Sequence, residues 1–264
     1  MKLLLSVNKK FYEVNMKGIF DLIDKKDLDH AIGGIELYID TLKEYEVEMA
    51  VLIAKKLKER KMKLQIHATK LEKDVLKQYE YLKLYHKLSQ IMEEKILVVY
   101  HPFEEKDKET EIYLTSIAMK RLNMHIEDRK YNLKLTLENL DDMGEMKRLK
   151  LEDVYNIAKK IPNVGLTYDI GHEVVEGRCK YELDKKYIGR IKNIHLHDIS
   201  LTGVPHYPFY AKKTQIKKVI KLLKEIDYKG NIVLEIALDY LRGNTYEEKL
   251  EEYLNEFIYV KKAM

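Results

Sequence analysis

Short apolar runs alternate with amphipathic stretches along the whole chain. The runs predict strands near residues 2–7, 33–39, 62–67, 96–101, 133–138, 164–169, 191–197 and 231–236. In the stretches between them, apolar residues recur at intervals of three and four, as at Val51, Ala54 and Leu57, which is typical of helices with one buried face. We therefore expect helices within 41–60, 72–94, 108–128, 151–160 and 212–226.

Six of the predicted strands end in a residue that can bind a metal. These residues are His67, His101, Glu138, Asp169, His195 and Glu235. Alternating strands and helices build either an open doubly wound sheet or a closed barrel. An open sheet gathers its site at one switch point, whereas a closed ring brings successive strand ends together. The pattern therefore predicts an α/β protein with a single (β/α)8 TIM barrel domain over residues 1–264.

Composition and charge fit an enzyme of this kind and disfavour several other classes. The chain has 48 basic and 44 acidic residues, a net charge of +4, so charge alone gives no reason to expect a nucleic-acid partner. Cys179 is the only cysteine, which excludes an internal disulfide and suits the cytoplasm. We find no signal peptide and no apolar stretch long enough to span a membrane. No phosphate-binding loop or dinucleotide fingerprint appears, so neither NAD nor ATP is expected.

Four of the strand-end residues form a candidate metal site. In a barrel, Glu138, Asp169, His195 and Glu235 would project into one mouth. Two unit charges 4 Å apart repel by about 4 kcal/mol at an effective dielectric of 20, so three carboxylates need a cation, protonation or basic neighbours. Their mostly oxygen donor set suits a divalent metal: Mn²⁺, Mg²⁺, Co²⁺ or Zn²⁺. The alternative is that each residue simply ends a strand and faces solvent.

Two further histidines lie close to these residues in the sequence. Gly171 lets the chain turn between Asp169 and His172, so both side chains can face one centre. His197 lies two residues after His195, which places both on one face of the strand. We expect Asp198 to hold a neighbouring imidazole in its metal-binding tautomer.

The order and spacing of several short motifs resemble the xylose isomerase-like TIM-barrel superfamily. The motifs are Gly34-Ile-Glu-Leu37, Ile66-His-Ala68, Leu137-Glu-Asn139, Asp169-Ile-Gly-His172, His195-Leu-His-Asp198 and Val233-Leu-Glu235. The resemblance covers essentially the whole chain. The superfamily includes sugar-phosphate isomerases and epimerases, relatives of inosose dehydratase and hydroxypyruvate isomerase, and endonuclease IV.

The resemblance to the epimerases implies roles for individual residues. Glu138, Asp169, His195 and Glu235 would bind one divalent metal. Glu138 and Glu235 would also be the catalytic residues, transferring protons on opposite faces of a sugar through a metal-bound cis-enediolate. His172 would orient a substrate oxygen. Glu36 is a candidate for this site, but it could equally be a structural hydrogen-bond acceptor at the barrel mouth.

The resemblance to endonuclease IV implies a different reaction, zinc-dependent cleavage of DNA at abasic sites. His67, His101, His172 and His206 stand where that enzyme has additional zinc ligands, but Val204 replaces an aspartate. An intermediate form would hold a second ion with His67, His101, Glu138 and His206. These histidines, with His197, are therefore assigned to a second metal or to the substrate. A third reading is a non-catalytic metal or sugar sensor.

The remaining predictions concern charged residues, single histidines and assembly. Arg178, Arg242 and Lys212-Lys213 are the candidates for binding an anionic substrate group, against solvated surface charge as the alternative. His30, His86 and His125 are expected to be solvated. The expected partner is a small carbohydrate, with nucleic acid left as the alternative, and related barrels favour a homo-oligomer.

Overall fold

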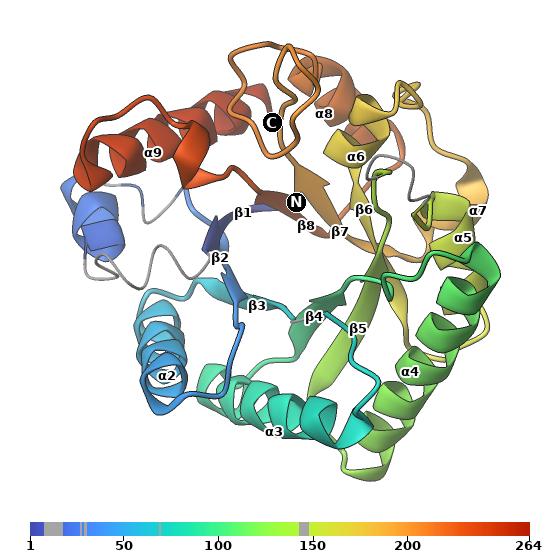
Figure 1. Ribbon diagram of the computed structural model, residues 1–264. Coiled ribbons are helices and arrows are strands. Elements are labelled where there is room, and N and C mark those ends of the chain that lie inside the picture. The colour runs from blue at the N-terminus through green and yellow to red at the C-terminus, as the bar shows by residue number, and fades with distance from the viewer. Residues whose placement is uncertain (8–17, 27, 29–30, 69, 143–147) are drawn as a thin grey trace.

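Eight parallel strands close into a barrel, as predicted. The computed structural model describes residues 1–7, 18–26, 28, 31–68, 70–142 and 148–264. The strands follow one another around the ring in chain order (Figure 1). They are β1 (Lys2–Val7), β2 (Gly34–Tyr38), β3 (Lys63–His67), β4 (Ile96–Tyr100), β5 (Leu133–Glu138), β6 (Gly165–Asp169), β7 (Ile191–Leu196) and β8 (Asn231–Leu234).

The first strand closes the ring by pairing with both its neighbour and the last strand. Leu4 lies opposite Gly34 of β2 and opposite Val233 of β8. Gly34 has a φ of +155°, and a Cβ atom there would lie 2.2 Å from the carbonyl oxygen of Lys63. Only glycine permits that approach, so this residue sets how closely β2 and β3 can pack at their first pair.

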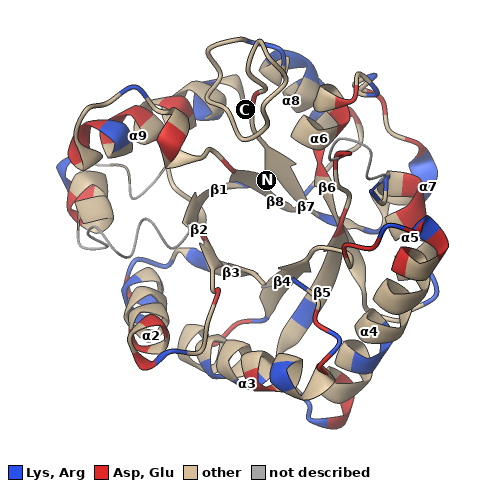
Figure 2. Cartoon of the chain, in the orientation of Figure 1, with Lys and Arg blue, Asp and Glu red and all other residues tan. Residues whose placement is uncertain are grey.

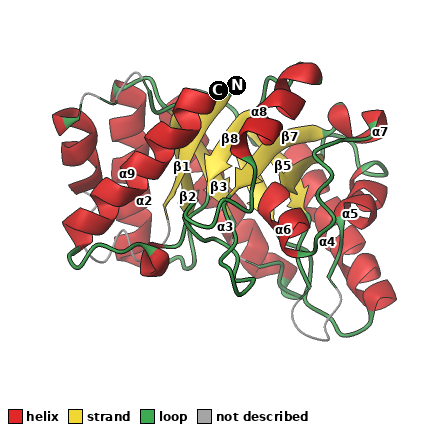
Figure 3. Ribbon diagram, turned by 90° about the horizontal axis from the view of Figure 1, so that it is seen from above, coloured by secondary structure: helices red, strands yellow, loops and turns green. Residues whose placement is uncertain are grey.

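Helices surround the barrel on its outside (Figures 1 and 3). Five of them lie within the predicted stretches: α2 (Glu44–Glu59), α3 (Val75–Met92), α4 (Lys108–Asp128), α5 (Leu151–Ala158) and α8 (Ile216–Glu225). Among the described residues, further helical segments were not predicted, and they include α6 (Ile170–Val175), α7 (Lys185–Ile188), η1 (Leu238–Tyr240) and α9 (Tyr246–Ala263). The start of α9 is stabilised locally, because Thr245 and Glu248 form a reciprocal capping box there.

Strand side chains divide between two environments. Leu3, Leu5 and Val7 of β1 are fully buried in the apolar core shared with the helices. Part of the inside of the barrel is polar instead: Asn231 donates to Gln65 at 2.9 Å, and Gln65 donates to Glu36, with all three side chains wholly or partly buried. This hydrogen-bonded interior leads from the start of the strands toward their carboxyl ends, where the candidate site lies.

The expectation that His86 and His125 are solvated is wrong. Both are partly buried and pack against Tyr131, with ring centroids 4.5 Å and 5.6 Å away. The helical spacing did not show that α3 and α4 both present these rings to Tyr131. His30 lies outside the described residues.

Charge is spread over the outer helices in both signs, as Figure 2 shows for α4, α5 and α9. Among the described residues, no helix combines the length and the apolarity that crossing a bilayer requires.

Candidate metal centre

Three carboxylates and one imidazole converge at the carboxyl end of the barrel. Glu138 and Asp169 are the last residues of β5 and β6, His195 lies near the end of β7, and Glu235 directly follows β8. Each offers a ligand atom, and these atoms lie within 4.8 Å of one another. We call these four residues the carboxylate cluster.

The imidazole of His195 faces carboxylates on both sides. Its Nδ1 lies 3.0 Å from Glu138 Oε1, 2.9 Å from Glu235 Oε2 and 3.9 Å from Asp169 Oδ2. Its Nε2 lies 3.2 Å from the carboxylate of Glu36. When Nε2 carries the proton and donates to Glu36, Nδ1 presents its lone pair to the cluster. This is the arrangement by which an outer carboxylate orients a metal-binding histidine.

The cluster fits a divalent cation because one oxygen of each carboxylate is buried without a hydrogen bond. Glu138 Oε2, Asp169 Oδ2 and Glu235 Oε2 are buried and make no hydrogen bond with the described residues. Buried polar atoms are nearly always hydrogen-bonded, so three such oxygens in one place need an explanation. A hard cation would satisfy them together, as the donor set predicts.

The carboxylates of the cluster favour the ionised form. Burial raises the pKa of Glu138, but His195 and His101 outweigh burial and hold that pKa well below its ordinary value. Burial also raises the pKa of Asp169, but His172 and His197 outweigh burial and lower that pKa to about 2. Burial also opposes ionisation of Glu235, whose pKa His195 and His206 hold well below the ordinary range. Negative charge is therefore available for a cation.

A second group shares Glu138 with the carboxylate cluster. His67 ends β3 and His101 directly follows β4, and their Nε2 atoms lie 3.6 Å and 3.3 Å from Glu138 Oε2. His67 Nδ1 lies 3.2 Å from the carbonyl oxygen of Ala68. Donation from Nδ1 to that carbonyl leaves Nε2 as a free ligand atom, and Nε2 is buried without a hydrogen-bond partner among the described residues.

A third group consists of His172, His197 and His206, which we call the histidine cluster. Its ligand atoms also lie within 4.8 Å of one another. His172 comes from α6, His197 directly follows β7, and His206 lies in the loop between β7 and α8. The structure thus divides the additional histidines predicted from the sequence into two groups, one with His67 and His101 beside Glu138 and one with His197 beside Asp169.

One prediction about the surroundings of the cluster needs correction, and one residue predicted to bind an anion can be placed. The carboxylate of Asp198 does not hold an imidazole; it accepts the backbone N–H of Thr214 at 2.7 Å, and the carbonyl oxygen of Asp198 lies 3.0 Å from His197 Nδ1. Arg242 is exposed and stacks on Tyr210, with the guanidinium 3.9 Å from the ring centroid.

Two of the other candidate cations, Arg178 and Lys213, have local partners. Arg178 pairs with Glu173 and Glu176 at 3.2 Å and 3.1 Å. Lys213 donates to the carbonyl oxygen of Leu201, and Lys212 is exposed. Binding of an anionic substrate group by any of these residues stays a prediction.

Sequence reasoning missed Gln65, Asn193 and Asn231, which support Glu36 from inside the barrel. Asn193 lies 3.5 Å from the Glu36 carboxylate, and Gln65 connects it to Asn231. Gln65 and Asn193 each lie two residues before a strand-end histidine, His67 or His195. That spacing places them on the same strand face, and it is the signal that could have identified them.

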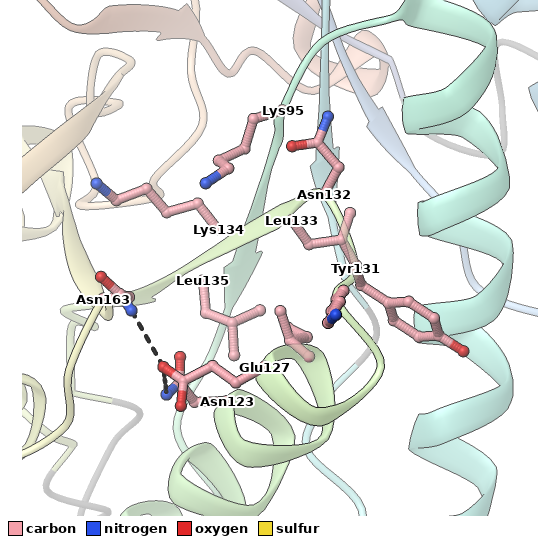
Figure 4. Close-up of a pocket in the computed structure, with 11 residues that line it drawn as sticks. Lys95, Asn123, Glu127, Tyr131, Asn132, Leu133, Lys134, Leu135 and Asn163 are labelled. Carbon is pink, nitrogen blue, oxygen red and sulfur yellow. Dashed lines mark hydrogen bonds between the residues drawn. The ribbon is translucent and has the colours of Figure 1, made fainter.

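The opposite end of the barrel carries a pocket of about 400 Å³ (Figure 4). It lies beside the end of α4 and the start of β5, and Lys95, Lys134 and Asn163 help to line it. Active sites of TIM barrels lie at the carboxyl ends of the strands. The candidate site is therefore the acidic and histidine-rich mouth, and this pocket is not part of it.

A closed parallel barrel with ionisable residues gathered at its carboxyl mouth defines a TIM barrel with the layout of an enzyme. The family model for the xylose isomerase-like TIM barrel matches residues 28–257. The chain belongs to this family, as the sequence motifs indicated.

Individual relatives show how far the similarity extends. The inosose dehydratase of Bacillus cereus (strain AH820) is 31% identical over an alignment of 105 residues, and the match covers 33% of this chain and 35% of that protein. The matched segments cover little more than a third of the curated relatives' length. The 3-keto-D-glucoside 4-epimerase YcjR from E. coli has a TM-score of 0.72 at 11% identity, covering 99% of both chains. The IolI protein, whose structure has a bound zinc atom, has a TM-score of 0.67 at 19% identity and covers 99% of this chain and 98% of its own. At these identities the structural matches establish the fold alone.

Proposed function

We propose that this protein is a divalent-metal-dependent sugar or sugar-phosphate isomerase or epimerase. The observation that carries the proposal is the convergence of Glu138, Asp169 and Glu235 on His195, with one buried oxygen of each carboxylate lacking a hydrogen-bond partner. The metal dependence rests on this geometry. The substrate class rests on the family and on the epimerase and dehydratase names of its members.

The bound ion would supply Lewis acidity, which acidifies the carbon–hydrogen bond next to a sugar carbonyl. Glu138, Asp169, His195 and Glu235 would hold it. These residues differ in how far they are buried, and this difference bears on which of them a substrate can reach. Glu138, Asp169 and His195 are essentially inaccessible, whereas the side chain of Glu235 is 18% exposed.

The exposure of Glu235 supports a position on the substrate side of the site. His101 and His206 are also partly exposed, so these residues and Glu235 line the entrance. Glu235 is therefore positioned to remove a proton from a substrate entering the mouth, and Glu138 lies deeper, where it can return a proton from another direction. General acid–base catalysis of this kind contributes about 10²- to 10⁴-fold in rate.

Deuterium exchange tests this proposal. The chain is incubated with Mn²⁺ and a panel of ketoses and ketose phosphates in D₂O, and deuterium at the carbon beside the carbonyl is followed by NMR. We expect exchange with at least one substrate, and loss of exchange in Glu138→Gln and Glu235→Gln. Unchanged exchange in both variants would exclude the assigned roles.

A second candidate function is metal-dependent phosphoester cleavage. The specific observation that favours it is the group formed by His67, His101 and Glu138, because Glu138 belongs to the carboxylate cluster as well. Two metal sites that share a carboxylate can stabilise both the attacking and the leaving oxygen of a phosphoester. Zn²⁺-dependent nicking of a duplex with one abasic site, absent with an intact duplex, would favour this function over the isomerase.

A further inference from the structure

We propose that the pocket at the amino end of the barrel binds the phosphate group of a phosphorylated small molecule. This pocket lies at the opposite end from the carboxylate cluster, so the proposal does not depend on the sugar chemistry proposed above. The binding groups are Lys95, Lys130 and Lys134, which help to line the pocket. Their side chains make no hydrogen bond or ion pair with the described residues.

Lys134 is held in the pocket by its position in β5. It is the second residue of this strand and lies opposite Leu97 of β4. Its side chain is partly buried, whereas that of Lys95 is exposed. Figure 4 shows both side chains extending toward the same side of the pocket. Two ammonium groups are therefore available to one ligand.

The acidic residues next to Lys95 in the chain are engaged by other lysines. Glu93 pairs with Lys58 at 2.5 Å, and Glu94 pairs with Lys63 at 3.6 Å. These two carboxylates therefore do not neutralise Lys95, although they directly precede it.

Among the described residues that line the pocket, Glu127 is the one acid. Its Oε1 accepts the side-chain amides of Asn123 and Asn163, each at 3.0 Å, and it pairs with none of the lysines. The end of α4 adds little negative charge, because the carbonyl oxygen of Ile126 accepts the N–H of Tyr131 at 2.9 Å. The pocket thus has three cationic side chains and a single anionic one, which hydrogen-bonds to amides.

Two further cations add to the positive charge around Lys134. Burial lowers the pKa of Lys134, and the charges of Lys192, Lys95 and Arg190 lower it further. Arg190 Nη1 and Lys192 Nζ donate to backbone carbonyl oxygens, at 2.9 Å and 2.6 Å. These acceptors are uncharged, so they leave the positive charge uncompensated. A bound anion would relieve the repulsion between these side chains.

The charge and shape of the pocket favour a phosphate ester over other anions. A phosphate group carries a charge of about −1.5 to −2 near neutral pH, which suits several lysines better than a singly charged carboxylate does. The volume of about 400 Å³ is in the range of small-molecule sites. Ile126, Leu133 and Leu135 give the pocket an apolar side. Inorganic phosphate has no apolar part to place there, whereas the organic group of an ester can pack against these residues.

Binding of phenyl phosphate to the full-length protein tests the site. Calorimetry measures the affinity for phenyl phosphate, inorganic phosphate and phenol in the wild type and in Lys134→Gln, Lys95→Gln and Lys55→Gln. Lys55→Gln is the control, because Lys55 is an exposed lysine of α2 and its loss changes the net charge by the same amount. Circular dichroism checks that each variant is folded.

We expect phenyl phosphate to bind more tightly than inorganic phosphate, and phenol not to bind. Lys134→Gln should weaken the binding of phenyl phosphate by at least about 10-fold, the usual effect of losing a hydrogen bond to a charged group. The loss in Lys95→Gln should be smaller, because Lys95 is more exposed. Lys55→Gln should match the wild type.

Lysine labelling locates the ligand without any substitution. Reductive methylation followed by mass spectrometry should show slower labelling of Lys95 and Lys134 when phenyl phosphate is present, and no change at Lys55. Wild-type affinity in folded Lys134→Gln, or unchanged labelling of Lys134 at saturating phenyl phosphate, would overturn the site. Equal affinity for inorganic phosphate and phenyl phosphate would overturn the assignment to an ester.

Discussion

Glu36 and His195 form a fully buried pair beneath the carboxylate cluster, with His195 Nε2 3.2 Å from the Glu36 carboxylate. The pair comes from β2 and β7, which lie far apart in the chain. Because Glu36 engages one ring nitrogen, the other faces Glu138 and Glu235. The sequence left two roles open for Glu36, a residue of the site or a structural acceptor at the barrel mouth. The structure favours the structural acceptor.

Replacing Glu36 with glutamine should weaken metal binding about 10- to 100-fold, the usual effect of losing an outer-shell partner. The amide keeps the shape of the side chain but removes the charge that holds the His195 proton at Nε2. Competition with a chelator of known affinity measures the change. Glu46→Gln is the matched control, because Glu46 is also buried but accepts the backbone N–H of Thr41 away from the site. Equal losses in the two variants would contradict the role of Glu36.

Glu138→Gln and Glu235→Gln should both reduce turnover by at least about 100-fold, the lower range for general acid–base groups. Their effects on metal affinity should differ. Glu138 contacts His67, His101 and His195 from a buried position, whereas Glu235 is partly exposed. We expect the larger loss of affinity in Glu138→Gln, measured by calorimetry beside the exchange assay. The reverse order would argue against Glu138 as the inner ligand.

Tyr253→Phe should destabilise the closure of the barrel. The buried Tyr253 hydroxyl accepts the backbone N–H of Ser6 in β1 at 2.9 Å and lies 2.6 Å from the carbonyl oxygen of Leu234 in β8. Loss of these contacts should lower the free energy of unfolding by about 1–3 kcal/mol, because buried backbone groups are left unpaired. Urea unfolding measures the loss. Tyr259→Phe, at an exposed tyrosine of the same helix, should change it little.

Glu111 should make stability fall as pH rises toward neutrality. Burial raises its pKa to about 7 despite the nearby Arg148, from an ordinary value of 4.5. The folded state therefore binds the proton more tightly than the unfolded state, and this advantage is lost as pH rises from 4.5 through 7. Between pH 5 and pH 8, the wild type should lose on the order of 2 kcal/mol relative to Glu111→Gln. Chemical unfolding at both pH values checks this, and parallel pH profiles would contradict it.

The strands were predictable from the sequence because each is a compact apolar run, and their boundaries agree with the structure within a few residues. The short helices α6 and α7 were missed because four to six residues hold too little periodicity to recognise. The long helix α9 has an apolar face, with Leu250, Tyr253, Leu254 and Phe257 buried, but it was not selected from the pattern.

Strand ends also account for the part of the site that the sequence predicted. Glu138, Asp169, His195 and Glu235 follow apolar runs, so closure of the barrel alone brings them together. The histidine cluster depends on a loop instead. An antiparallel bridge between Asp198 and Tyr207 folds the loop back and brings His206 to His197. No local pattern specifies that return, and so the sequence could not divide the histidines into groups.

Anomalous diffraction from crystals loaded with Mn²⁺ or Zn²⁺ tests the central claim most directly. The account predicts a peak about 2.0–2.3 Å from ligand atoms of Glu138, Asp169, His195 and Glu235, the range expected for such ions. Well-ordered side chains with no anomalous peak among these four residues, at saturating metal, would contradict the metal centre and the chemistry proposed for it.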